Sequence, residues 1–120
     1  MVRQLAVALF VAMAALFAAG QTVAAPTAYI LQGSVSPGHI RLKGGLGQPY
    51  LHGRQGLYRI SVTDSSHSDD FRLVGPGVNV VITGVPFVGA RSVQVMLRPG
   101  TYRYRSDPHR ARMNAKFVVG

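Results

Sequence analysis

The sequence contains no cysteine, and only four of its 120 residues are acidic. Without cysteine the chain has no disulfide, no zinc–thiolate site and no cysteine nucleophile, so a small domain must be held by its core and by sheet hydrogen bonds. Helix-forming residues in periodic array are nearly absent, and the chain shows no internal repeat and no low-complexity tail. What remains to specify a fold is a set of short alternating runs separated by glycine and proline.

A hydrophobic run long enough to span a membrane is also missing. The longest apolar run, residues 5–19, has fifteen residues, whereas a membrane-spanning helix needs about 20. Arg3 precedes the run and small residues follow it up to Ala24, which is the pattern of a cleavable secretory signal. We therefore predict a signal peptide at residues 1–24 and one exported domain at residues 25–120, periplasmic or secreted and free of the membrane; an uncleaved anchor is the alternative.

The scarcity of acidic residues leaves the predicted mature chain strongly basic. Without Arg3, twelve basic residues oppose four acidic ones, which gives a net charge of +8. Such a field favours anionic partners, and outside the cytoplasm we expect an envelope surface or an acidic protein rather than nucleic acid. A solvated basic surface with no dedicated ligand is the alternative. The basic residues are spread along the chain: Arg41, Lys43, Arg54, Arg59, Arg72, Arg91, Arg98, Arg103, Arg105, Arg110, Arg112 and Lys116.

Short alternating runs predict an all-β sandwich. In residues 57–63, apolar and polar side chains alternate, so we expect a half-buried strand. Residues 92–98 and 101–105 alternate in the same way, and the tight turn at residues 98–100 predicts that they form a hairpin. The total comes to about seven or eight strands in two sheets, with weaker candidates at residues 29–35, 39–43, 71–74, 78–83 and 115–119.

The C-terminal third carries a specific arrangement of residues. A Pro99-Gly100-Thr101-Tyr102 turn is followed by Ser106-Asp107-Pro108-His109 and, after three further residues, by Met113. Upstream, residues 69–78 read DDFRLVGPGV, and residues 31–42 begin with LQGSV. Over about residues 29–120, these stretches resemble the plastocyanin-like (cupredoxin) family, in which the turn is followed by Cys, Asp, Pro and His, and then by Met.

The resemblance implies a cupredoxin-like Greek-key β-sandwich with a type 1 copper site, in which two histidines and one cysteine thiolate bind copper together with a weak axial methionine. Carried over residue by residue, the second histidine falls on His109 and the axial methionine on Met113. The first histidine falls on Asp69, and the cysteine falls on Ser106. Two of the four implied ligands are therefore replaced.

The replacement of the cysteine removes the ligand that makes a blue-copper centre. A serine hydroxyl stays protonated near neutral pH and binds copper(I) poorly. We therefore predict an exported cupredoxin-like domain that has lost its type 1 site, has no cofactor, and acts as a monomeric binding or structural module. The alternative is a weak binder of copper or another divalent ion through His109, Met113 and Asp69, with electron transfer less favoured. A related ligand set for Zn²⁺ or Cu²⁺ is Asp69 and His109, to which His67 or Asp70 could be added.

The neighbourhood of Asp69 departs from the family pattern as well. The resemblance implies an asparagine and a histidine at the positions that Asp70 and Arg72 occupy. The two carboxylates could instead pair with Arg72, Arg110 or Arg112 as ordinary loop charges. The loops around the implied site have therefore changed together with its ligands.

A hydrolase is a further interpretation, because Ser106, Asp107 and His109 include nucleophile, acid and base types. Neighbouring residues in a tight turn seldom converge as a catalytic triad. Neither an oxyanion hole nor a substrate pocket is readable from the sequence. We therefore expect no enzyme activity.

Overall fold

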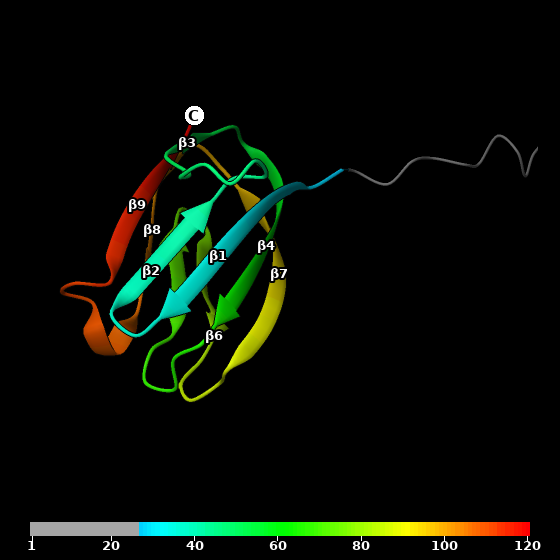
Figure 1. The fold of residues 1–120 in the computed structure, drawn as a ribbon. Helices are drawn as coiled ribbons and strands as arrows, with labels where there is room; N and C mark the ends of the chain where they lie inside the picture. Colours follow the sequence, from blue (N-terminus) through cyan, green and yellow to red (C-terminus); the bar gives the residue numbers. More distant parts are fainter. Residues whose placement is uncertain (1–26) are drawn as a thin grey trace, which may run out of the picture.

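The computed structural model describes residues 27–120, and the predicted signal peptide at residues 1–24 lies outside the described residues. Two β-sheets lie face to face in this part of the chain (Figure 1). Between residues 27 and 120, no helix is both long enough and apolar enough to cross a membrane. The elements are β1 (Tyr29–Ser36), β2 (His39–Lys43), β3 (His52–Gly53), β4 (Gly56–Asp64), β5 (Phe71–Gly75), β6 (Val78–Thr83), β7 (Gly89–Leu97), β8 (Gly100–Arg105), the 3-10 turn η1 (Asp107–His109) and β9 (Asn114–Val119).

The strand order confirms the predicted all-β sandwich. One sheet has the order β2-β1-β4-β7 and the other the order β3-β9-β8-β5-β6. Most neighbours are antiparallel, while β1 runs parallel to β4 and β3 runs parallel to β9. The sequence predicted seven or eight strands, and the additional one is β3, which is only two residues long and pairs with the last strand.

The core lies between the sheets and follows from the alternation of apolar residues along the strands. On β4 the inward side chains are buried, while Arg59 and Thr63 face solvent. Two aromatic pairs stack in the core, Phe71 on Tyr104 with ring centroids 5.5 Å apart, and Tyr102 on Phe117 at 5.3 Å. The buried hydrophobic residues are Leu31, Val35, Leu42, Tyr58, Ile60, Val62, Phe71, Leu73, Ile82, Leu97, Tyr102, Tyr104, Met113, Phe117 and Val119.

The predicted hairpin of residues 92–98 and 101–105 is wrong. β7 pairs with β4 in one sheet, whereas β8 pairs with β5 and β9 in the other, so residues 98–100 carry the chain across the sandwich. The Tyr102 hydroxyl ties this corner by accepting the Arg98 N–H at 2.8 Å. Gly100 has φ +145°, and a Cβ there would lie 2.6 Å from the Pro76 ring. The alternation of apolar and polar residues shows which face of a strand is buried. Because strands of both sheets bury one face, the alternation does not show to which sheet a strand belongs.

Candidate functional site

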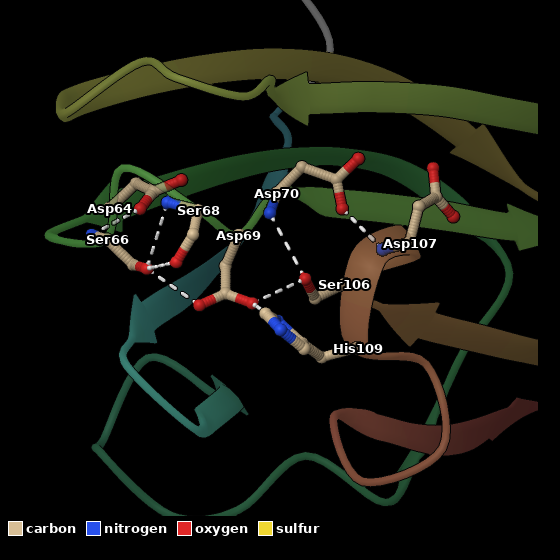
Figure 2. Close-up of polar contacts among 8 residues, drawn as sticks. All are labelled: Asp64, Ser66, Ser68, Asp69, Asp70, Ser106, Asp107 and His109. Atoms are coloured by element: carbon tan, nitrogen blue, oxygen red, sulfur yellow. Dashed lines mark hydrogen bonds and ion pairs between the residues drawn. The ribbon is translucent and has the colours of Figure 1, made fainter.

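Two segments far apart in sequence meet at one end of the sandwich: residues 65–70 after β4, and residues 106–113 after β8 (Figure 2). Main-chain hydrogen bonds close the second segment into a compact loop. The His109 N–H donates to the Ser106 carbonyl at 3.1 Å, the Met113 N–H to the His109 carbonyl at 2.9 Å, and the Ser106 N–H to the Met113 carbonyl at 3.0 Å. The three positions of this loop that the resemblance singled out are therefore joined directly.

Asp69 lies at the centre of the site. Its Oδ1 accepts hydrogen bonds from the Ser106 hydroxyl at 2.8 Å and from His109 Nδ1 at 2.6 Å (Figure 2). Its Oδ2 accepts the Ser66 hydroxyl at 2.6 Å. The Asp69 side chain is only 2% exposed, whereas that of His109 is 35% exposed. The structure thus brings together Asp69, Ser106 and His109, and the imidazole forms the solvent-facing side of the group.

The hydrogen bonds decide the charge of Asp69. Burial by itself raises the pKa of this carboxyl, but the hydrogen bonds from Ser66, His109 and Ser106, together with the charge of His109, outweigh it and hold the pKa below its ordinary value. The carboxylate is therefore ionised near neutral pH and can only accept hydrogen bonds. It follows that Nδ1 of His109 carries a proton, and this N–H donates a hydrogen bond to Asp69 Oδ1.

A pair of carboxylates, Asp70 and Asp107, lies beside the Asp69 site. The Asp107 N–H donates to Asp70 Oδ1 at 2.6 Å. The Asp107 side chain pairs with the Nε of Arg72 at 2.7 Å and with that of Arg105 at 3.1 Å. Burial and the nearby charge of Asp107 raise the pKa of Asp70 despite the Asp107 N–H, whereas the two arginines outweigh burial and lower the pKa of Asp107. The arginines therefore favour the ionised form of Asp107, whereas burial and the neighbouring charge disfavour the ionised form of Asp70.

The alternative interpretation that Asp69 and Asp70 pair with loop arginines is wrong. Arg72 forms its ion pair with Asp107. Among the described residues, Arg110 and Arg112 form no ion pair. Hydroxyl and imidazole donors take the place of arginine at Asp69, because they reach its buried oxygens from within the two loops.

Sequence reasoning missed Asp64, the last residue of β4, which is 1% exposed. Its Oδ1 accepts the Ser66 N–H at 2.9 Å, and its Oδ2 is buried without a hydrogen-bond partner. A signal was present, because position 64 continues the inward alternation of Tyr58, Ile60 and Val62. All four acidic residues of the sequence therefore gather at this end of the molecule, and we call them the acidic cluster: Asp64, Asp69, Asp70 and Asp107.

The donors present do not fit a type 1 copper centre. Such a centre needs a thiolate, and the position implied for it holds Ser106, a fully buried hydroxyl that donates to Asp69 and accepts the Asp70 N–H at 3.3 Å. Asp69 already accepts three hydrogen bonds. Residues 27–120 contain no group of three His, Cys, Asp or Glu side chains arranged to hold a metal ion. The role of Met113 as an axial ligand stays a prediction; the residue is buried in the core.

The order of contacts also differs from that of a catalytic triad. In a triad the histidine lies between the serine and the aspartate, where it removes the serine proton. Here Asp69 lies between Ser106 and His109, and both donate to the same carboxylate oxygen. Asp107, the acid of the hydrolase interpretation, contacts Arg72 and Arg105 instead. In this arrangement the serine proton is directed to a weakly basic carboxylate.

Comparison with known proteins identifies the fold. No family model matches the sequence, and no curated protein matches it either. Among solved structures, reduced rusticyanin has a TM-score of 0.58 and 17% identity over 81% of this chain and 82% of its own. Rusticyanin from Thiobacillus ferrooxidans has a TM-score of 0.55 and 17% identity over 80% and 79%. A likeness at this identity concerns the fold alone, and the fold of this chain is a cupredoxin-like β-sandwich.

Proposed function

We propose that this protein is an exported cupredoxin-like binding module, in which a hydrogen-bonded carboxylate, Asp69, stands at the position where the family resemblance implies the first histidine ligand of copper. We propose neither electron transfer nor enzyme activity for this protein. The observation that carries it is the environment of Asp69, which is buried and accepts hydrogen bonds from Ser66, Ser106 and His109. These partners satisfy the carboxylate without a metal ion.

Energetics support the proposal, because a cation bound at Asp69 would compete with three donors that are already paired with this carboxylate. Ser66 and Ser106 are almost fully buried, so their hydroxyls would lose partners that water cannot replace. Leaving a buried donor unsatisfied costs about 1–3 kcal/mol for each group. Without a thiolate, only one imidazole, one carboxylate and one thioether remain to repay that cost.

The chain outside the acidic cluster supports export and a binding role. The short apolar run at residues 5–19 is typical of a cleavable signal. With every acidic residue gathered at one end, the positive charges elsewhere have no carboxylate to pair with, and such a field attracts anions. The proposed partner is therefore an anionic molecule or surface outside the cytoplasm.

A second candidate, weak copper binding, is favoured by one observation. The His109 side chain is 35% exposed, and its Nδ1 is the ring nitrogen held by Asp69, so Nε2 is left to meet a divalent ion from solvent. Imidazole suits Cu²⁺ and Zn²⁺. A single imidazole gives a loose site, which would fit a weak metal carrier and not a blue-copper electron shuttle.

The experiment that tests the proposed replacement restores the implied ligands. Ser106→Cys with Asp69→His supplies two histidines, one thiolate and Met113 at the spacing that the resemblance implies, so adding Cu²⁺ should produce an intense visible absorption band. Ser106→Cys alone should give a weaker or altered band, because a carboxylate holds the first histidine's place. As a control, Ser92→Cys adds a thiol on exposed β7 and should give no such band. A double variant that folds but stays colourless would mean that position 69 does not correspond to the first histidine.

A further inference from the structure

Residues of β2 and the start of β9 line a groove of about 370 Å³. These two strands belong to different sheets and lie close together along one side of the sandwich (Figure 1). The exposed cations Arg41, Lys43 and Arg112 are among the lining residues. We call this groove the basic groove. Its other walls include Tyr104 and Leu42, which belong to the core. The volume is within the range of small-molecule sites, which is roughly 300–1,000 Å³.

The charges of the basic groove are not neutralised by the protein. No carboxylate lines the groove. Within residues 27–120, none of its three cations takes part in an ion pair. The whole sequence has only four acidic residues, and all of them belong to the acidic cluster. The chain therefore has no side-chain carboxylate left for Arg41, Lys43 or Arg112, and their mutual repulsion makes a bound anion favourable.

The groove also offers hydrogen-bonding and apolar groups for a ligand. β2 is the edge strand of its sheet, and the groove lies along the side that does not face β1. Asn114 contributes an amide on the opposite wall. Pro49 joins Tyr104 and Leu42 as an apolar surface on which the uncharged body of a ligand could rest. A ligand pocket typically combines such an apolar lining with a few polar groups that fix orientation.

We propose that the basic groove is a binding site for a phosphate group, held by Arg41, Lys43 and Arg112. Guanidinium groups match the geometry of phosphate oxygens through paired hydrogen bonds. A phosphate monoester carries nearly two negative charges at neutral pH, which suits three cations better than one carboxylate would. This inference rests on the proposed binding function and names its ligand chemistry.

The test is a titration of the exported protein at low ionic strength, followed by NMR of backbone amides. The probes are inorganic phosphate and glucose 6-phosphate. We expect saturable shifts confined to residues 38–43 and 112–114. Equal affinities would identify free phosphate as the ligand, and tighter binding of the sugar phosphate would identify a phosphate ester. Removing both guanidinium groups by Arg41→Ala and Arg112→Ala should weaken binding more than about tenfold, because each guanidinium donates charge-assisted hydrogen bonds to the phosphate oxygens.

A matched control separates the groove from the general positive charge. Arg59→Ala removes one exposed arginine from β4, outside the groove, and should change the affinity by less than about twofold. Equal weakening by Arg59→Ala and Arg41→Ala, or shifts spread over all exposed arginines, would overturn the proposal. Absence of saturable binding by either probe would also overturn it. Copper spectra of the same samples report on Asp69 separately, so failure at the groove is distinguishable from failure of the proposed copper-free site.

Discussion

The acidic cluster and the basic groove differ in whether their charged side chains are buried and paired within the protein. In the acidic cluster, the carboxylate of Asp69 is buried and its oxygens are occupied by donors from the protein itself. In the basic groove, Arg41, Lys43 and Arg112 are exposed, and no carboxylate lines the walls. The comparison teaches that the charge of a cluster does not by itself identify a ligand site. The Asp69 carboxylate is satisfied internally and has little to offer a cation, whereas the cations of the basic groove are available for an anion.

The largest expected effect concerns the core beneath the basic groove. Tyr104 lines the groove, is 7% exposed and stacks on Phe71, so Tyr104→Ala should lower the free energy of unfolding by about 3–5 kcal/mol. Arg103→Ala, on the outward face of the same strand, should cost less than about 0.5 kcal/mol. Urea denaturation measures both values. Similar losses from the two variants would show that the inward and outward faces of β8 have been confused.

The next largest effect concerns the contribution of Asp69 to the stability of the fold. Asp69→Ala removes the acceptor of three hydrogen bonds, two of them from buried hydroxyls, and should destabilise the protein by about 2–4 kcal/mol. Ser68→Ala alters an exposed residue of the same loop and should cost less than about 0.5 kcal/mol. Equilibrium unfolding in urea compares the two. An Asp69→Ala variant as stable as the unmodified protein would contradict the account of a satisfied buried carboxylate.

Acid should weaken the acidic cluster through Asp69. Its pKa is lower in the folded protein than the ordinary value of 3.8. Its contribution to the free energy of unfolding is therefore complete above pH 3.8, and is lost as the pH falls through that value and then through the folded pKa. Asp69→Asn removes this titration, so the variant should lose less stability than the unmodified protein between about pH 4 and pH 2.

Two other carboxyl groups of the acidic cluster have shifted pKa values, which makes the variant necessary. Asp107 has a lowered pKa and contributes with the same sign as Asp69, whereas the raised pKa of Asp70 contributes with the opposite sign. Both groups remain in Asp69→Asn, so the difference between the two pH profiles isolates Asp69. Parallel profiles from unfolding measurements at each pH would show that Asp69 is not stabilised as a carboxylate.

The smallest effect is expected at the rim of the basic groove. Arg41→Ala should change the free energy of unfolding by less than about 0.5 kcal/mol, because the side chain is exposed and forms no ion pair among residues 27–120. The sign should be stabilising at low salt and should vanish at high salt, since the substitution relieves repulsion from Lys43 and Arg112. A clear loss of stability in thermal unfolding would mean that Arg41 has a structural partner.

Much of the fold could be predicted from the sequence, because alternation along each strand records which residues face the core. The segment Val78–Thr83 was predicted with the bounds that the structure shows, and Gly56–Asp64 with one residue fewer at each end. β3 could not be predicted, since two residues are too few to alternate. The prediction of a hairpin around Gly100 was wrong, because a tight turn does not show whether the chain returns to the same sheet.

The candidate site could be predicted only in part. The resemblance placed Asp69, Ser106 and His109 at positions of the implied copper ligands. In the structure the Ser106 hydroxyl and His109 Nδ1 both contact Asp69 through hydrogen bonds. The role of Ser66 could not be predicted, because it depends on how residues 65–70 turn after β4. The basic groove was not visible either, since residues 38–43 and 112–114 become neighbours only when the two sheets pack together.

The central claim is that the hydrogen bonds of the protein satisfy the Asp69 carboxylate without a metal ion. Its most direct test is titration of the unmodified exported protein with Cu²⁺ at neutral pH, in competition with a chelator of known affinity and followed by visible absorption. The account predicts no intense thiolate-to-copper band and no binding that survives the chelator, with at most loose association through His109. One site that holds Cu²⁺ against the chelator, and that is lost in Asp69→Ala and in His109→Ala, would contradict it.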